Sequence, residues 1–242
     1  MSINSLLPIG IYEKAFPNEL GWAERLSMTA QAGYDFLEIS IDESEFRLAR
    51  LQWTTAERNS VKKAIADAGI GIMTMGVSAH RKFPLGSASE TLRRQGLDIL
   101  HRSIDLSAEI GIRIIQIMGY DTFYEPSTED SRARYLEGLL EGTRWASGSG
   151  VMLALENVDV VTVDSVEKAM HFVKKINSPW FNTYPDIGNM TAAVTDRRWN
   201  YHSHKATWWE CTSRIPAQGN YEACHLEPGL CALKRLLILF SR

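Results

Sequence analysis

Two short strand candidates in the second half of the chain end in an acidic residue. The first candidate, Met152–Asn157, follows the breaker Gly148-Ser149-Gly150 and has four apolar residues directly before Glu156. The second candidate, Asn182–Asp186, ends in Asp186. A short apolar run between breakers predicts a strand buried on both faces of a parallel sheet. In α/β barrels the carboxyl ends of such strands carry the chemistry. Two successive strands that end in acids therefore predict a shared site. The alternative is that either acid caps a helix or lies in a turn.

Composition limits the classes of protein that fit this chain. It has 242 residues, of which 45% are hydrophobic, which suits one α/β barrel. The net charge of −3 gives no basic excess for nucleic acid or an anionic membrane. The amino terminus lacks the regions of a signal peptide, and no stretch has the length of a membrane span. Cys211, Cys224 and Cys231 show neither paired metal spacing nor a disulfide framework. We expect a soluble cytoplasmic protein.

Strand and helix signals alternate along the chain up to Asp196. Apolar runs predict six strands, at Pro8–Tyr12, Phe36–Ser40, Ile70–Met75, Ile112–Ile117, Met152–Asn157 and Asn182–Asp186. Helical periods and caps predict helices at about 19–32, 55–68, 88–110, 128–145 and 165–176. This alternation implies a parallel sheet with right-handed crossovers.

Two α/β architectures compete for this pattern. A doubly wound sheet is disfavoured because no glycine-rich phosphate fingerprint follows the first strand. We therefore predict a (β/α)8 TIM barrel. It is incomplete, because six βα units are recognisable and the last two strands are lost or replaced.

Four separated motifs carry a resemblance to a known family. Gly10–Ala15, Ser78–Ser87, Ile115–Asp121 and Tyr184–Asn189 resemble, in this order, motifs of the L-ribulose-5-phosphate 3-epimerases, which are xylose-isomerase-like barrels. The resemblance covers about residues 8–196. It implies 3-epimerisation of a pentulose 5-phosphate, interconverting L-ribulose and L-xylulose 5-phosphates in ascorbate and pentose catabolism.

Other activities remain open beside the epimerase. An aldose–ketose isomerase acting on a hexulose phosphate shares the same intermediate, and only the resemblance separates the two. A metal-dependent endonuclease on the related barrel is disfavoured by the absence of a basic excess and of a histidine-rich cluster.

The resemblance also implies a divalent metal ion and its ligands. Glu156 and Asp186 match the acids of the fifth and sixth strands in the family, where a seventh-strand histidine and an eighth-strand glutamate complete the set. Mg²⁺, Mn²⁺ or Zn²⁺ would suit such ligands. Epimerisation removes a proton beside a carbonyl on one face and returns one on the other, through an enediolate. Glu156 is implied as one of the two acid–base groups.

Polar residues near other strand ends are candidates for contacts with the substrate, a small sugar phosphate. They are Glu38, Ser78, His80, Arg81 and Asn189, with Lys14 as a further candidate. Glu38 is expected either to bind a substrate hydroxyl or to cap a helix. His80 and Arg81 could hold a phosphate or sugar oxygen, and the alternative is a solvated basic loop.

The chain departs from the family beyond Asp196. The following residues show no strand or helix period, and neither the histidine strand nor the glutamate strand is recognisable. His202, His204 and His225 do not stand at strand ends, so we do not assign them as ligands.

The genetic code offers an explanation for this departure. In the shifted frame, codons from Lys205 to Gly229 permit Gly-His-Met-Val-Gly-Met-His-Ile-Lys-Asp-Thr, which resembles the missing seventh strand with its histidine. We infer a frameshift near Arg197. The consequence is an impaired or inactive epimerase, or a non-functional remnant.

These observations divide the chain into a partial barrel and an aberrant tail. The partial barrel with the epimerase site spans residues 1–196, and the tail spans residues 197–242. Six strands of an eight-stranded barrel would leave two sheet edges open. The apolar residues within Leu230–Phe240 could form a helix over that gap or add a sticky patch. A complete barrel could form a homodimer.

Overall fold

Six parallel strands carry the fold in a computed structural model that describes residues 8–192, 210–211 and 236–238. They are β1 (Ile9–Tyr12), β2 (Phe36–Ile41), β3 (Gly71–Val77), β4 (Ile114–Met118), β5 (Met152–Glu156) and β6 (Phe181–Tyr184). Each strand pairs in parallel with the next one along the chain. The predicted α/β class and the six predicted strands are confirmed.

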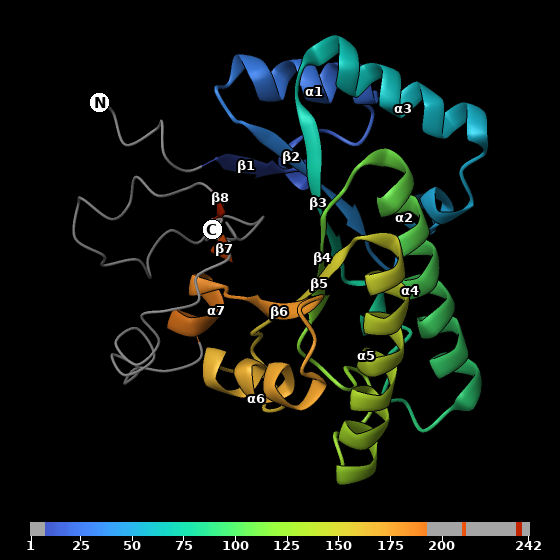
Figure 1. Cartoon of the computed structure of the whole chain (residues 1–242), viewed down its shortest axis with the longest axis vertical. Coiled ribbons are helices and arrows are strands. Elements are labelled where there is room, and N and C mark those ends of the chain that lie inside the picture. The colour runs from blue at the N-terminus through green and yellow to red at the C-terminus, as the bar shows by residue number, and fades with distance from the viewer. Residues whose placement is uncertain (1–7, 193–209, 212–235, 239–242) are drawn as a thin grey trace.

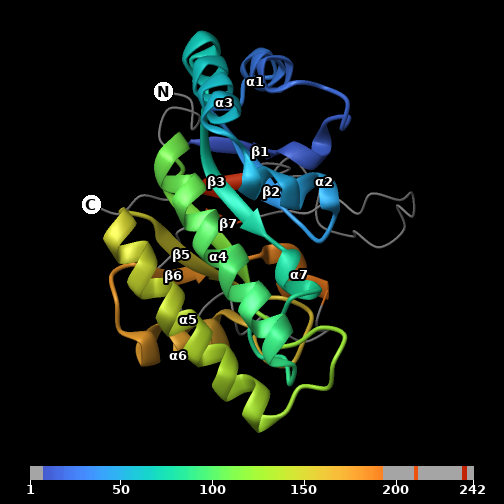
Figure 2. The same ribbon diagram turned by 90° about the vertical axis from the view of Figure 1, so that its right-hand side faces the viewer.

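Helices connect the strands and cover one face of the sheet. The long ones are α1 (Trp22–Gln31), α3 (Thr55–Ala68), α4 (Glu90–Ile110), α5 (Glu129–Ser149) and α6 (Val166–Ile176). Figure 1 shows them around the strands at the top, right and bottom of the view, and Figure 2 shows α4 and α5 running side by side. Short helical turns complete the connections: η2 (Glu13–Ala15), α2 (Glu45–Leu48), η3 (Ala49–Gln52), η4 (Ala79–Arg81) and α7 (Ile187–Ala192).

Capping residues explain where the helices begin and end. The Thr54 side chain accepts a hydrogen bond from the Glu57 N–H, and the Glu57 side chain accepts one from the Thr54 N–H, so α3 begins with a capping box. The helix ends at Gly69, whose positive φ of 65° suits glycine. Helix α5 runs to Ser149, beyond the predicted end near Trp145, because the left-handed residue that stops it is Gly150.

The two faces of the sheet bury different residues. Leu37, Ile39 and Ile41 of β2 belong to the large apolar core that the sheet forms with the helices. Because side chains alternate along a strand, Phe36 and Glu38 face the opposite side, which is the interior of the barrel. Phe36 packs there with apolar residues of three other strands, namely Ile114, Ala154 and Tyr184.

Two short strands from the tail extend the sheet. Strand β8 (Leu236–Ile238) pairs antiparallel with β1 through Ile9↔Leu237, and β7 (Glu210–Cys211) pairs antiparallel with β8. The expectation that both sheet edges stay open is therefore wrong on the β1 side. A free strand edge offers unpaired N–H and C=O groups, which an apolar Leu-Leu-Ile segment can pair. Within the described residues, this segment is a strand and not a helix.

This pairing differs from the closure of a complete barrel, in which all strands run parallel. On the other side of the sheet, no strand within the described ranges pairs with the outer edge of β6. The division at residue 196 into a partial barrel and a tail stays a prediction.

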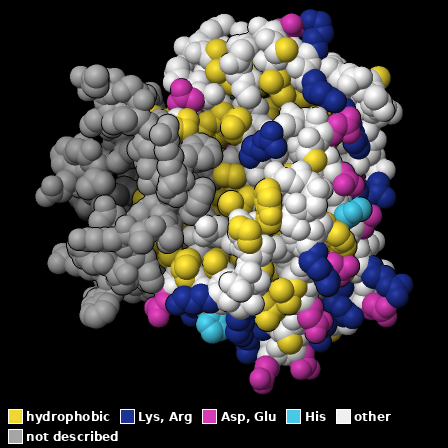
Figure 3. All heavy atoms as spheres, viewed as in Figure 1, with side chains coloured by type: hydrophobic (Ala, Val, Ile, Leu, Met, Phe, Trp, Pro, Cys, Tyr) yellow, Lys and Arg dark blue, Asp and Glu magenta, His cyan; other side chains and the backbone are white. Residues whose placement is uncertain are grey.

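Charges of both signs lie intermixed on the visible surface. Figure 3 shows Lys and Arg side chains beside Asp and Glu side chains on the right of the view, where Figure 1 places α4. This agrees with the small net charge of −3. None of the described helices combines the length and the apolar character needed to cross a lipid bilayer.

Candidate active site

Glu156 and Asp186 lie at the carboxyl ends of neighbouring strands. Glu156 is the last residue of β5 and pairs in register with Tyr184, the last residue of β6. Asp186 follows two residues later, so the strand itself stops short of the acid. Both acids have 0% of their surface exposed. The chain thus places two buried carboxylates where barrel enzymes carry their chemistry.

Two asparagine side chains join these acids into one cluster. The Asn157 side chain donates to the Asp186 carbonyl at 2.9 Å and accepts from the Asp186 N–H at 2.8 Å. The Asn189 side chain donates to Glu156 Oε1 at 3.5 Å and to the Asn157 carbonyl at 3.0 Å. Asn157 therefore fixes the backbone of Asp186, and Asn189 reaches back to Glu156. Our sequence reading gave Asn157 no role, although it directly follows the strand-end acid.

Asp186 also caps a helix, but with only one of its oxygens. Its Oδ1 accepts from the Asn189 N–H at 2.9 Å at the start of α7. Its Oδ2 is buried and has no hydrogen-bond partner among the described residues. A buried carboxylate oxygen is costly without compensation, so this oxygen suits a cation or a ligand proton.

The two acids fit the oxygen ligands that a hard divalent cation prefers. Within the described residues, no group of three or more His, Cys, Asp and Glu side chains could hold a metal ion. Glu156 and Asp186 are therefore a pair, and further ligands would have to come from elsewhere in the chain or from the substrate. The assignment of both acids as ligands stays a prediction.

Glu38 lies inside the barrel and not at a strand end. Strand β2 continues to Ile41, so Glu38 is in its middle and does not cap a helix. Its Oε2 accepts hydrogen bonds from the Thr74 hydroxyl at 2.8 Å and from the Tyr184 hydroxyl at 2.6 Å. The Tyr184 contact spans the interior from β6 to β2. A role for Glu38 in binding a substrate hydroxyl stays a prediction.

His80 follows β3, in η4, and is buried. It has 1% of its surface exposed, and its Nε2 lies 3.1 Å from the Gly96 carbonyl of α4. Burial lowers the pKa of His80 to about 4, so the ring is neutral at pH 7. For this residue the alternative of a solvated loop is wrong. Its role in substrate binding stays a prediction.

Arg81 and Ser78 have different surroundings from His80. The Arg81 guanidinium lies over the Phe123 ring, 4.7 Å from its centroid. Its Nε is buried and has no hydrogen-bond partner among the described residues. Ser78 accepts a hydrogen bond at its carbonyl from the Tyr120 hydroxyl at 3.2 Å. Both residues follow β3, so they stand at the same end of the sheet as Glu156.

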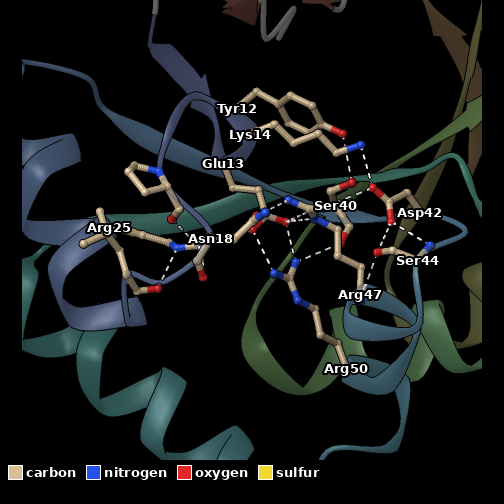
Figure 4. A network of polar contacts seen from close by, with 12 residues as sticks. Tyr12, Glu13, Lys14, Asn18, Arg25, Ser40, Asp42, Ser44, Arg47 and Arg50 are labelled. Carbon is tan, nitrogen blue, oxygen red and sulfur yellow. Dashed lines mark hydrogen bonds and ion pairs between the residues drawn. The ribbon is translucent and has the colours of Figure 1, made fainter. Parts of the chain in front are cut away.

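A buried network of charges occupies the carboxyl ends of β1 and β2, as Figure 4 shows. Glu13 is fully buried and accepts from the guanidinium groups of Arg25 and Arg50, while Arg47 lies 3.7 Å away. Glu13 Oε1 also accepts a hydrogen bond from the Ser40 N–H at 2.5 Å. Sequence reasoning missed this network, because its members are far apart along the chain.

Lys14 lies at the rim of this network and pairs with Asp42 at 2.7 Å. Burial opposes the ionisation of Asp42, but hydrogen bonds from Lys14 and Ser44 outweigh it and lower the pKa of Asp42 to about 2. The acidic segment after β2, residues 42–45, is partly helical, since Ser44 caps α2 and Glu45 begins it. In this structure Lys14 therefore forms an ion pair with Asp42.

Comparisons with known proteins identify the kind of barrel. Residues 26–216 match the family model described as Xylose isomerase-like TIM barrel. The chain is 42% identical over 194 residues to the L-ribulose-5-phosphate 3-epimerase UlaE of Salmonella typhimurium. This match covers 80% of the chain and 68% of that relative.

Solved structures with low sequence identity share the fold. A D-psicose 3-epimerase crystallised in the presence of D-fructose aligns with a TM-score of 0.66 at 19% identity, over 77% of this chain and 66% of that one. An L-ribulose 3-epimerase aligns with a TM-score of 0.62 at 21% identity, over 79% of this chain and 64% of that one. The chain thus spans about two thirds of the length of these proteins.

Proposed function

The chain belongs to the xylose isomerase-like TIM barrel family, and we propose that its site is built for 3-epimerisation of a pentulose 5-phosphate, L-ribulose or L-xylulose 5-phosphate. The family resemblance that the sequence predicted is confirmed. Its 42% identity to a named L-ribulose-5-phosphate 3-epimerase supports this choice of reaction. The observation that carries the proposal is the pair of fully buried acids, Glu156 and Asp186, joined by two asparagines at one end of the sheet.

Glu156 is the acid–base group in this proposal. A ketose exchanges the proton at C3 more readily than an ordinary alcohol carbon, because the resulting enediolate spreads its charge toward the carbonyl oxygen. Glu156 takes that proton on one face, and a second group returns one on the other. Asn189 donates to Glu156 Oε1 and so helps to hold the carboxylate in place.

Glu156 and Asp186 would together hold a divalent cation such as Mg²⁺, Mn²⁺ or Zn²⁺. A bound cation of this kind stabilises negative charge that develops on the substrate oxygens. Asp186 Oδ2, which has no hydrogen-bond partner among the described residues, is the atom that fits this assignment best. Asn157 positions the acid by holding its backbone on both sides.

Arg81 is our candidate for the phosphate of the substrate. It follows β3 in η4, beyond the strand end, and its guanidinium lies over the Phe123 ring. Arginine presents paired donors that match phosphate oxygens. The Arg81 Nε has no hydrogen-bond partner among the described residues, so this donor could serve a phosphate oxygen.

The tail limits what the chain as it stands can do. The proposed frameshift near Arg197 removes the histidine and the glutamate that would complete the metal site and supply the second proton-transfer group. We therefore expect the 242-residue chain to be impaired or inactive, and a chain with the restored reading frame to be active.

Proton exchange in the frame-restored chain tests this proposal. It should convert L-ribulose 5-phosphate to L-xylulose 5-phosphate while the C3 proton exchanges with deuterated solvent. Glu156→Gln should lower both rates by about 10²–10⁴-fold, because it removes the base and weakens the metal site. Glu137→Gln changes an exposed acid on α5 and is the matched control. Full conversion by Glu156→Gln would overturn the mechanism, and an aldose product would indicate an aldose–ketose isomerase instead.

A further inference from the structure

Arg81 differs from the other arginines of the described residues, because its charged group has no polar partner among them. Every other arginine that is buried or half-buried in this part of the chain donates a hydrogen bond to a carboxylate or carbonyl oxygen. Arg81 is half-buried, and within the described residues it has neither a hydrogen bond nor an ion pair. A charged group that leaves water without a partner costs free energy, so this guanidinium calls for an explanation.

The Phe123 ring holds the Arg81 guanidinium in place of a polar partner. The distance from the guanidinium carbon to the ring centroid is 4.7 Å, which is within the range of a cation–π interaction. This contact attracts the charge without using a hydrogen-bond acceptor. The donors of the guanidinium are therefore not committed to a protein oxygen, and their paired arrangement matches the oxygens of a phosphate group.

Phe123 is itself held by its neighbours, although 38% of its surface is exposed. Its ring makes edge contacts with the rings of Tyr120 and Tyr124, at centroid distances of 5.3 Å and 5.0 Å. Tyr120 is buried, and its hydroxyl donates to the Ser78 carbonyl at 3.2 Å. The ring that lies against Arg81 is therefore packed between two other rings, one of which is fixed by a hydrogen bond.

Asp121 anchors the segment that carries Phe123. Its carboxylate is fully buried and accepts hydrogen bonds from the hydroxyl groups of Ser127, Ser131 and Thr162. Its carbonyl accepts from the Gly86 N–H at 3.0 Å. A Cβ on Gly86 would lie 2.5 Å from this carbonyl oxygen, so the close approach of the two backbones requires glycine.

Residues 120–123 and residues 78–86 therefore contact each other at three points. Two are the hydrogen bonds at the ends of the segment 78–86, and the third is the cation–π contact of Arg81 between them. The two segments follow β4 and β3, which pair in parallel. On its other side β4 pairs with β5, where Met118 is in register with Glu156. The segment after β4 thus fixes Arg81 at the end of the sheet where Glu156 lies.

We propose that Phe123 is a positioning residue for Arg81, whose guanidinium it holds in place to bind the phosphate group of an open-chain sugar phosphate. This inference rests on the proposed function for its ligand class. A free arginine side chain has to be ordered when it binds, and the ring reduces this entropy cost because Arg81 is already held. Phe123 is therefore a determinant of the preference for phosphorylated sugars.

NMR titration of the full 242-residue chain tests this assignment, with inorganic phosphate and L-ribulose 5-phosphate as probes in the absence of divalent cations. Both probes should shift the Arg81 Nε–H resonance, and sodium chloride at the same ionic strength should not. Phe123→Leu should weaken the affinity for both probes by roughly 3- to 30-fold, because one cation–π contact is lost. Phe123→Tyr keeps the ring, so its affinity should stay within about twofold of that of the unaltered chain.

Phe46→Leu is the matched control. Phe46 also lies near arginines, with 5.9 Å from its ring centroid to Arg47 and 5.2 Å to Arg50, but both arginines have ion pairs with acids. Its loss should leave the affinity for both probes unchanged. A purely structural role of Phe123 would lower the melting temperature of Phe123→Leu and spare its affinity.

A second measurement does not depend on the folding of a variant. Nuclear Overhauser contacts between the Phe123 ring and the Arg81 side chain should persist in the unaltered chain at saturating inorganic phosphate. The loss of these contacts on binding would overturn the assignment, because the ring would then not hold the bound guanidinium.

Two further results would overturn it: no shift of the Arg81 resonance with either probe, or unaltered affinity in Phe123→Leu. The outcome is distinct from that of the exchange experiment on Glu156. Phosphate binding that depends on Phe123, without epimerisation by the frame-restored chain, would reject the proposed function alone. Epimerisation with phosphate affinity unaffected by Phe123→Leu would reject this inference alone.

Discussion

Two buried acids at strand ends of the same sheet have opposite surroundings. Glu13, after β1, accepts from two arginines and the Ser40 N–H, with a third arginine nearby. Asp186, after β6, has one oxygen that caps α7 and a second, buried oxygen without a hydrogen-bond partner among the described residues. Both side chains are 0% exposed.

The difference is the one that we expect between a structural acid and the acid that we propose as a metal ligand. All of the charge on Glu13 is compensated within the protein, so it holds the ends of β1 and β2 and the segment around α2 together. Among the described residues, the charge on Asp186 is compensated only in part, as the proposed role in binding a cation requires. Burial alone does not distinguish these two acids. The hydrogen-bond and ion-pair partners of each carboxylate oxygen do distinguish them.

Removing the charge of Glu13 should have the largest effect on stability. Glu13→Gln leaves Arg25 and Arg50 buried without their counter-charge, and breaking a buried pair in this way costs about 3–5 kcal/mol. Urea unfolding measures the loss. Asp67→Asn, at an exposed ion pair with Lys63, is the control and should change stability by less than about 0.5 kcal/mol. An equally small loss for Glu13→Gln would show that the network is not structural.

His80 is intermediate between Glu13 and Asp186 in the hydrogen bonding of its side chain. One ring nitrogen faces the Gly96 carbonyl, and the other has no hydrogen-bond partner among the described residues. Its pKa is about 4 in the folded chain, because burial disfavours the charged ring. The unfolded chain, with a pKa near 6.5, binds the proton first as the pH falls. Stability should therefore drop by about 2 kcal/mol between pH 7 and pH 5.

Unfolding curves at these two pH values check this expectation. His80→Asn keeps a polar side chain but cannot titrate, so its stability should change less over the same interval. An equal drop in the variant and the unaltered chain would assign the pH dependence to other groups.

Asp186→Asn should have the smallest effect on stability. The amide oxygen can still accept from the Asn189 N–H, and the uncompensated charge disappears, so the free energy of unfolding should change by less than about 1 kcal/mol. The affinity for Mn²⁺ should nevertheless fall by tenfold or more, measured by calorimetry on the frame-restored chain, because a charged ligand is lost. A stability loss as large as that of Glu13→Gln would place Asp186 with the structural acids.

Local patterns were sufficient to predict the sheet and the position of the two acids of the candidate site. The short strand candidates that end in Glu156 and Asp186 are recognisable from the local sequence alone. The side-chain partners could not be predicted in this way, since they depend on contacts between distant residues. Glu13 and Arg50 are 37 residues apart, and the Asn157 clamp on Asp186 spans 29. Neither separation leaves a periodic signal.

The tail shows a second limit of local patterns. Three residues, Leu236–Ile238, were expected to lie in a helix or a sticky patch, yet they form a strand on the β1 edge. An open edge provides the hydrogen-bonding partners, so the strand depends on the fold and not on the period of its own sequence.

Metal affinity tests most directly whether Glu156 and Asp186 are half of a divalent-cation site. Calorimetric titration with Mn²⁺ should compare the 242-residue chain with the frame-restored chain under identical conditions. The account predicts that the frame-restored chain binds roughly 100-fold more tightly or better, because it regains two protein ligands. Equal, tight binding by both chains would contradict the account, since the tail as it stands would then supply the missing ligands.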